Sequence, residues 1–256
     1  MAFPCVLTIG GTDPSGGAGL TADARACVAF GAHALPVITA VVAQNTQGVL
    51  EWEAVSPSLL AAQLDHLLQD ITPQAVKTGL IPNAEAVEII AARLEQLNVP
   101  VIVDPVFAPS SGAAFSDDKT IGALCELLMP MAEVLTPNWI ETSRLLNLII
   151  DDAPQAAKAL KDRFRPQGIV IKGGHAPHNP KEVFDYFFDG ERTHLLSAPR
   201  IEGIEVRGTG CLLASAIAAQ RAHNVHPLEA IKNAKLWITE QIKNAQPIGK
   251  GRRVAV

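Results

Sequence analysis

The sequence predicts a single α/β domain with a central, mostly parallel sheet flanked by helices on both faces. Short runs rich in Val and Ile alternate with longer segments of helical periodicity, an order typical of parallel strands joined by crossover helices. The strand-like runs are almost continuously apolar, as in sheets that are covered on both faces. The 256 residues contain no internal repeat and no low-complexity linker, so we expect one domain over residues 1–256.

The elements follow in order along the chain. Apolar runs predict strands at residues 5–10, 35–43, 75–81, 99–105, 132–138 and 168–174. Helical spacing of apolar residues predicts helices at residues 21–30, 84–97, 154–164, 209–222 and 227–244. A further helix with a stripe of leucines begins at Ser56-Pro57. The segments 182–188 and 193–199 predict a hairpin or an edge pair around Asp189-Gly190.

Composition excludes several classes of protein. Apolar residues make up 48% of the chain and charged residues 18%, which is enough for a large core. The net charge of -5 argues against a nucleic-acid-binding surface, and no apolar run is long enough to cross a bilayer. The N-terminus lacks a charged leader, and the four scattered cysteines form no C-x-x-C pair. We therefore expect a cytoplasmic protein without a zinc site.

The stretch VRGTGCLLASA, residues 206–216, predicts an anion-binding loop. Gly208 and Gly210 allow the backbone around Thr209 to approach a ligand closely, and the helix that follows adds its free amides and its positive dipole end. An ordinary strand-to-helix turn is an equally good interpretation. Cys211 lies in the first turn of that helix, where the field favours a thiolate. A small buried apolar residue is the alternative for Cys211.

The loop GGTDPSGGAG, residues 10–19, predicts close packing of backbone against a small ligand. It is not a Walker A loop, because no G-K-[ST] ends it, and Asp13 and Pro14 interrupt the dinucleotide pattern. Asp23 lies at helical spacing beyond the loop. A solvated helix aspartate is about as probable at this position as a ligand-binding one.

Two acids and a lysine end apolar strands or begin helices near this edge of the sheet. Asp104 ends the strand at 99–105, and Glu141 follows Asn138 by one turn of an expected helix. Such a pair of carboxylates suits hydrated Mg²⁺, although a first-turn acid also complements a helix dipole. Lys172 ends another buried strand and is well placed to neutralise phosphate; a surface lysine is the alternative. The histidines show no metal-ligand pattern.

Several strand-end motifs occur in one order over essentially the whole chain. They are GGTDPSGGAGLTAD, VITAVVAQNTQGV, KTGLI, DPV, TPN-x-x-E, KGGH and GTGC. Together they resemble the hydroxymethylpyrimidine and phosphomethylpyrimidine kinases of thiamin biosynthesis, which have the ribokinase-like fold and are usually homodimers. The resemblance implies transfer of the γ-phosphate of MgATP to the hydroxymethyl group of 4-amino-5-hydroxymethyl-2-methylpyrimidine. In many members a second phosphate is then added to that monophosphate.

The resemblance also implies roles for individual residues. The expected pyrimidine pocket contains Gly11, Ala18, Asp23, Gln44, Leu80 and Phe107. Magnesium is expected at Asp104 and Glu141, and the nucleotide phosphates at Asn138, Lys172 and Thr209. The expected catalytic group consists of Lys172, Gly208, Thr209, Gly210 and Cys211. Cys211 matches the position where many ribokinase-like enzymes have a base aspartate, and the Gln44 amide offers a donor and an acceptor to an aminopyrimidine edge.

The chain departs from the family pattern at several positions. Arg207 replaces a histidine, Leu212 replaces a polar residue and Leu80 replaces a methionine. Ser110 and Ala113 replace a lysine and an aspartate in the loop 105–115, which concerns the second phosphorylation in particular. Arg207 is a candidate to restore the lost positive charge. Two alternatives stay open: a pyridoxal or pyridoxine kinase, and a non-catalytic sensor that binds pyrimidine or nucleotide.

Overall fold

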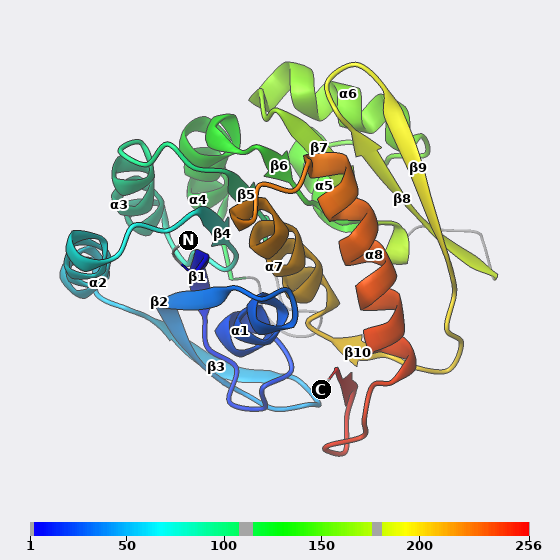
Figure 1. The fold of residues 1–256 in the computed structure, drawn as a ribbon, viewed down its shortest axis with the longest axis horizontal. Helices are drawn as coiled ribbons and strands as arrows, with labels where there is room; N and C mark the ends of the chain where they lie inside the picture. The colour runs from blue at the N-terminus through cyan, green and yellow to red at the C-terminus, as the bar shows by residue number, and fades with distance from the viewer. Residues whose placement is uncertain (1–2, 108–114, 176–180, 256) are drawn as a thin grey trace.

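The central sheet has nine strands in the order β3-β2-β1-β4-β5-β6-β7-β8-β9 (Figure 1). The computed structural model describes residues 3–107, 115–175 and 181–255. The strands are β1 (Cys5–Gly11), β2 (His33–Gln44), β3 (Val49–Ala54), β4 (Ala75–Thr78), β5 (Val101–Val103), β6 (Val134–Leu135), β7 (Gly168–Ile171), β8 (Glu182–Phe188) and β9 (Thr193–Pro199). The six neighbouring strands β2, β1, β4, β5, β6 and β7 run parallel. The strand β3 pairs antiparallel with β2, and β8 pairs antiparallel with both β7 and β9.

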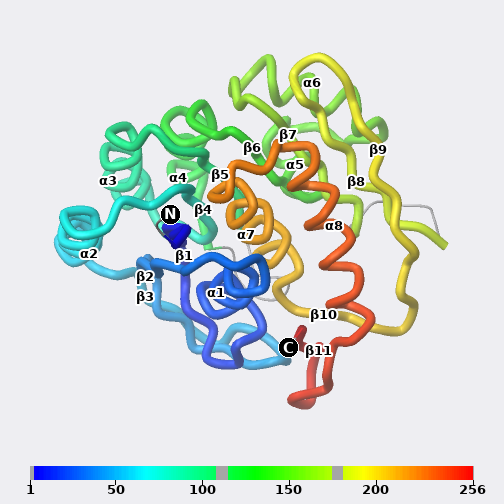
Figure 2. Tube along the Cα trace, viewed as in Figure 1, coloured from blue at the N-terminus to red at the C-terminus, as the bar shows by residue number. Residues whose placement is uncertain are grey.

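Helices cover both faces of the sheet (Figure 2). One face carries α2 (Pro57–Asp70), α3 (Ala84–Leu94), α4 (Asp118–Ala123), α5 (Trp139–Leu146) and α6 (Ala153–Phe164). The other face carries α1 (Gly19–Ala29), α7 (Thr209–Ala222) and α8 (Pro227–Lys243). The predicted α/β class and the two-sided helical cover are therefore confirmed.

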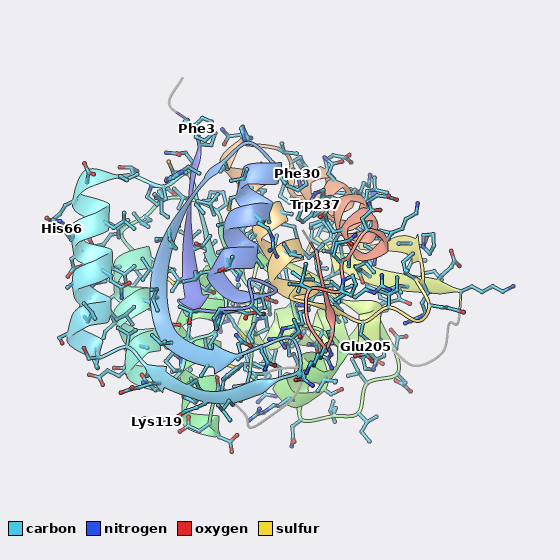
Figure 3. The ribbon with its side chains drawn as sticks, turned by 90° about the horizontal axis from the view of Figure 1, so that it is seen from below. Phe3, Phe30, His66, Lys119, Glu205 and Trp237 are labelled. Carbon is cyan, nitrogen blue, oxygen red and sulfur yellow. The ribbon has the colours of Figure 1, made fainter. Side chains whose placement is uncertain are left out.

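Strand residues alternate between the two cores, since successive side chains point to opposite faces of a sheet. On β1, Val6 packs toward α1, α7 and α8, whereas Leu7 packs toward α2 and α3. The central helix α7 is buried along most of its length, and its small residues allow it to lie close to the sheet. The rings of Phe30 and Trp237 meet edge to face at 5.4 Å and join α1 to α8 (Figure 3).

The six predicted strands are correct in place, but those at 75–81, 99–105, 132–138 and 168–174 are too long at their carboxyl ends. The segment 75–81 pairs only as far as Thr78. Continuous pairing of the segment 132–138 is limited to β6, with one isolated bridge from Asn138 to Lys172 beyond it. Pro137 has no N–H to donate, and Asn138 leaves the strand to cap α5. These shortened strands release Gly79 and Asn138 into the loops above the sheet.

Three features are absent from the sequence prediction. The edge strand β3 is half exposed, so its apolar signal is weak. The helix α4 continues into a π-helical turn (Leu124–Leu128) and a short 3-10 turn (Met129–Met131). A small parallel pair joins β10 (Val206–Arg207) to β11 (Arg253–Val254) near the C-terminus. Within the described ranges, no helix combines the length and apolarity needed to span a membrane.

Candidate active site

The glycine-rich turn before α7 lies directly against the loop that follows β1. Gly208 has a φ of 69°, a left-handed conformation that favours glycine. A Cβ at this position would overlap the carbonyl oxygen of Gly17, and it would also lie 2.8 Å from the Cα of Ala18. The two loops predicted to bind different ligands are therefore in backbone contact, with the free amides of α7 at their junction.

Lys172 and Asp104 lie beneath this turn. The Lys172 Nζ donates to Asp104 Oδ1 at 2.6 Å, and Thr136 Oγ1 donates to the same oxygen at 3.0 Å. A Cβ on Gly210 would be 3.2 Å from Lys172 Nζ, so the ammonium group faces the turn. Burial lowers the pKa of Lys172, but the carboxylates of Asp104 and Glu141 more than offset this and hold it above its ordinary value. The side chain is thus a fixed cation and not a surface lysine.

Glu141 caps its own helix. Its carboxylate accepts from the backbone N–H of Asn138 at 2.7 Å, while Asn138 Oδ1 accepts from the Glu141 N–H at 2.9 Å. This capping box confirms the alternative that a first-turn acid stabilises the helix start. The same carboxylate lies 3.9 Å from Lys172 Nζ. Burial, with a contribution from Asp104, raises the pKa of Glu141 to about 7.

The raised pKa predicts how Glu141 affects stability. The folded chain holds this proton to higher pH than the unfolded chain, so the contribution of Glu141 to stability falls as the pH rises from about 4.5 to about 7. Glu141→Gln keeps an acceptor for the Asn138 N–H but carries no charge. We expect the variant and the wild type to melt at similar temperatures near pH 5, and the variant to melt higher near pH 8. A difference in Tm that does not change with pH would contradict this assignment.

The thiol of Cys211 lies half-buried in the first turn of α7. Burial raises its pKa to about 11, and the carboxylates of Asp23 and Asp104 add to this rise, whereas Lys77 opposes it. This direction is opposite to the predicted thiolate and favours the alternative of a small buried residue. The helix end and Lys77 both favour the anion, but burial and the two carboxylates outweigh them.

Asp23, expected in the pyrimidine pocket, lies fully buried in the interior. Lys77 Nζ donates to both of its carboxylate oxygens at 2.9 Å, and Ser215 Oγ donates to one of them at 2.8 Å. The side chains of Asp23 and Lys77 are 0% and 1% exposed, which rules out the solvated aspartate. Ser215 lies one helical turn beyond Cys211, so this cluster supports α7 from below. The sequence signals for this cluster are weak: a lysine in the apolar strand 75–81 and a serine in a helix of small residues.

The end of β2 closes the other side of the junction. Gln44 Nε2 donates to the Thr12 carbonyl oxygen at 3.0 Å, and Gln44 Oε1 accepts from Arg207 Nη2. Gly11 lies against Leu80, whose side chain is 8% exposed. The structure therefore brings Gly11, Ala18, Gln44 and Leu80 together, as predicted.

Phe107 does not join this group. Its ring is 2% exposed within the core below α3, and the Arg144 guanidinium lies 5.6 Å from its centroid. The structure therefore places Phe107 in this core, and its role in the pyrimidine pocket stays a prediction. Ser110 and Ala113 lie outside the described residues.

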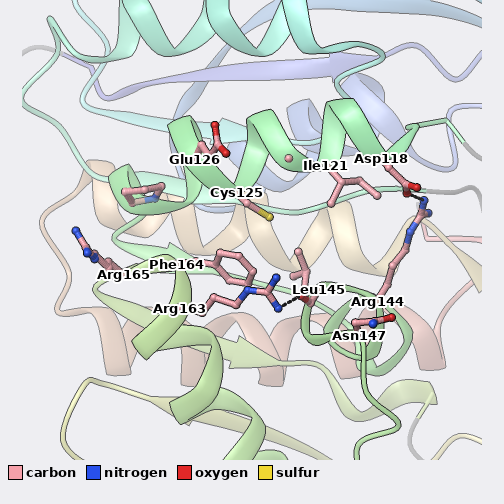
Figure 4. Close-up of a pocket in the computed structure, with 12 residues that line it drawn as sticks. Asp118, Ile121, Cys125, Glu126, Arg144, Leu145, Asn147, Arg163, Phe164 and Arg165 are labelled. Atoms are coloured by element: carbon pink, nitrogen blue, oxygen red, sulfur yellow. Dashed lines mark hydrogen bonds and ion pairs between the residues drawn. The ribbon is translucent and has the colours of Figure 1, made fainter.

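A surface cavity of about 610 Å³ lies elsewhere, between α4 with its π-helical turn on one side and α5 and α6 on the other (Figure 4). Three arginines line it, but they do not converge. Arg144 is 3.6 Å from Asp118, and Arg163 donates to the Leu145 carbonyl oxygen at 3.2 Å. The cavity contains none of the predicted site residues, so the junction at the start of α7 is the better candidate for chemistry.

Known kinases resemble this chain over almost its whole length. A family model described as phosphomethylpyrimidine kinase matches residues 13–255. A Synechococcus elongatus protein named hydroxymethylpyrimidine/phosphomethylpyrimidine kinase is 41% identical and covers 98% of this chain and 96% of its own length. A Clostridium difficile phosphomethylpyrimidine kinase structure has a TM-score of 0.80 at 29% identity, covering 93% of this chain and 98% of that chain. The Staphylococcus aureus pyridoxal kinase complex with ADP has a TM-score of 0.91 at 27% identity, covering 100% and 94%.

Proposed function

The chain belongs to the phosphomethylpyrimidine kinase family and is a kinase of thiamin biosynthesis that acts on an alcohol group, and from this premise we propose how its site works. The acceptor is the hydroxymethyl group of 4-amino-5-hydroxymethyl-2-methylpyrimidine, and the donor is ATP. The observation that carries the proposal is the contact of Gly208 with Gly17 and Ala18. This contact places the N-terminal end of α7, where we propose that phosphate binds, beside the proposed pyrimidine pocket with its Gln44 amide.

Each half of the junction has its own task. The amides of Gly208, Thr209 and Gly210 bind the transferring phosphate, with Lys172 below them to neutralise its charge. Asn138 forms a parallel bridge with Lys172 and lies on the nucleotide side. Gly11, Ala18, Leu80 and Gln44 hold the pyrimidine. In the transfer, the hydroxymethyl oxygen bonds to the γ-phosphorus while the bond from that phosphorus to the bridging oxygen of ADP breaks.

Asp104 and Glu141 are the proposed magnesium ligands. Mg²⁺ commonly binds through one or two carboxylates together with waters and substrate phosphates, and these two side chains fit that pattern. The described residues contain no cluster of three or more His, Cys, Asp or Glu side chains that could hold a metal alone. Lys172 lies between the two carboxylates and already neutralises part of their charge. The two residues therefore suit an ion that arrives with the nucleotide and is also bound by its phosphates. The bound ion would supply further neutralisation of the phosphate charge.

Cys211 is the proposed acceptor of the hydroxymethyl proton. Because burial raises the pKa of the thiol to about 11, Cys211 first has to lose its own proton to solvent. The thiolate then takes the hydroxymethyl proton while the oxygen bonds to the γ-phosphorus. Phosphoryl transfer depends mainly on positioning and charge neutralisation and does not need a strong base. A homodimer and a cytoplasmic location are further proposals, which the resemblance and the composition support.

A coupled assay for ADP release tests the proposal. We expect magnesium-dependent turnover with the aminopyrimidine alcohol, and less turnover with pyridoxal. Turnover with the aminopyrimidine monophosphate would extend the proposal to the second phosphorylation. Pyridoxal as the preferred acceptor would support the alternative kinase. Binding of an acceptor without any acceptor-dependent ADP release would support the sensor.

A further inference from the structure

Arg207 joins two walls of the proposed acceptor site. It is the last residue of β10, directly before Gly208, and its side chain is 8% exposed. Its Nη2 donates to Gln44 Oε1 and lies 3.7 Å from Asp13 Oδ2. Its Nε has no hydrogen-bond partner within the described part of the chain. Burying a guanidinium with an unpaired N–H lowers the stability of the fold, so we look for a function of this side chain that offsets the loss.

The first consequence concerns the orientation of the Gln44 amide. The Nε2 donates to the Thr12 carbonyl oxygen, and the Oε1 accepts from Arg207. If the amide turned over, its NH₂ would face a guanidinium donor and its oxygen would face a carbonyl oxygen. Arg207 therefore holds the amide in one orientation. One N–H and one lone pair of Gln44 remain for a ligand.

The second consequence concerns the loop after β1. The Asp13 carboxylate is 2% exposed and accepts from the Ser15 N–H at 2.9 Å and from the Ala18 N–H at 2.8 Å. The Arg207 guanidinium lies 3.7 Å from this carboxylate, which also interacts electrostatically with Arg25. A Cβ on Gly17 would lie 3.2 Å from the Cβ of Arg207, so the loop packs on the base of the same side chain. One side chain thus contacts both walls of the pocket.

We propose that Arg207 is a positioning residue that sets acceptor preference by fixing the Gln44 amide. An amide held in one orientation suits a ring that has a donor next to an acceptor. A 4-aminopyrimidine has this pair, because its amino group donates and the neighbouring ring nitrogen accepts. The ring nitrogen of pyridoxal has a methyl group beside it and no adjacent donor. Arg207 therefore favours aminopyrimidines over pyridines. This inference rests on the proposed function, since it takes Gln44 to lie in the acceptor pocket.

Arg207→Met tests the inference. We expect the Kd and KM for the aminopyrimidine alcohol to rise about tenfold, as for the loss of one buried polar partner. The KM for ATP should change less than about twofold, because the phosphate loop is backbone and Lys172 is intact. The KM for pyridoxal should change little, so the ratio of kcat/KM values for the two acceptors should fall. Arg207→Lys keeps a cationic donor and should recover part of the preference.

Two controls make the outcome clear. Arg93→Met removes a guanidinium that binds Asp65 at 2.9 Å on the distant α2–α3 pair, and it should leave acceptor binding unchanged. In a Gln44→Leu background, which should itself weaken acceptor binding more than ATP use, the further effect of Arg207→Met on acceptor Kd should nearly vanish. Calorimetry measures these Kd values without turnover.

The proposal and its premise can fail separately. If the wild-type protein binds no aminopyrimidine, the proposed function is wrong. If the wild type binds it and Arg207→Met binds it equally well, Arg207 is not a positioning residue. An Arg207→Met effect that is equal for ATP and for both acceptors, or equally large in the Gln44→Leu background, would also overturn the inference.

Discussion

Replacing Cys211 with alanine is expected to lower kcat by about 10²–10⁴-fold, the usual contribution of a general base. Nucleotide affinity should stay nearly unchanged, because the proposed phosphate ligands are backbone amides and Lys172 and not the thiol. Cys211→Asp should retain more activity than Cys211→Ala, since a carboxylate can also take the proton. Steady-state kinetics of both variants, together with their melting temperatures, measure this. An alanine variant with wild-type turnover would remove Cys211 from the reaction.

Alkylation gives an independent test of the same thiol. Because burial raises the pKa of Cys211 to about 11, the thiolate fraction at neutral pH is small and should rise about tenfold per pH unit up to about pH 10. Inactivation by a neutral alkylating reagent should follow this slope, and bound acceptor should slow it. The Cys211→Ala variant reports the background reaction at the other cysteines. A plateau near pH 8 would contradict a raised pKa.

Replacing Lys77 with methionine is expected to destabilise the protein by about 3–5 kcal/mol, the usual cost of removing one partner of a buried ion pair. The variant leaves the Asp23 carboxylate buried with only Ser215 as a side-chain donor. Urea unfolding measures the loss. We also expect slower alkylation of Cys211 in this variant, because Lys77 lowers the pKa of the thiol.

Two further variants separate charge from packing at Lys77. Lys77→Met combined with Asp23→Leu removes both charges, and it should recover much of the lost stability. Lys158→Met breaks an exposed ion pair with Asp162 on α6, and it should change stability by no more than about 0.5 kcal/mol. A similar small loss in Lys77→Met would show that the buried pair contributes little.

Much of the fold can be predicted from the sequence, because the strands covered on both faces are continuous apolar runs. The strand β1 and the helix α7 lie where the predictions place them. The edge strand β3 escapes the prediction, since one of its faces is exposed and its charged residues dilute the pattern. The carboxyl ends of the four strands from β4 to β7 are overestimated, because an apolar run does not show where ladder pairing stops.

The candidate site is predicted in part for a related physical reason. The rule that ligands bind beyond strand ends brings Asp104, Lys172 and Gly208 together without a structure. The rule does not tell which way a side chain turns, so Phe107 and Asp23 are assigned to the pocket although both point into the interior. Their partners lie far away along the chain, and no local pattern reveals them.

The long-range contacts of α7 bear on the order in which the protein is made. Ser215 reaches Asp23 across 192 positions of the chain, and Arg207 reaches Gln44 across 163. During synthesis, the loop after β1 and the strand β4 leave the ribosome long before α7, which packs on both. Contacts between residues so far apart in the chain form slowly. Until α7 is made, Asp23 lacks its contact with Ser215, and the turn at residues 208–210 is missing. A nascent chain that stops before α7 is therefore expected to bind neither substrate, so that catalytic competence arises in a single late step.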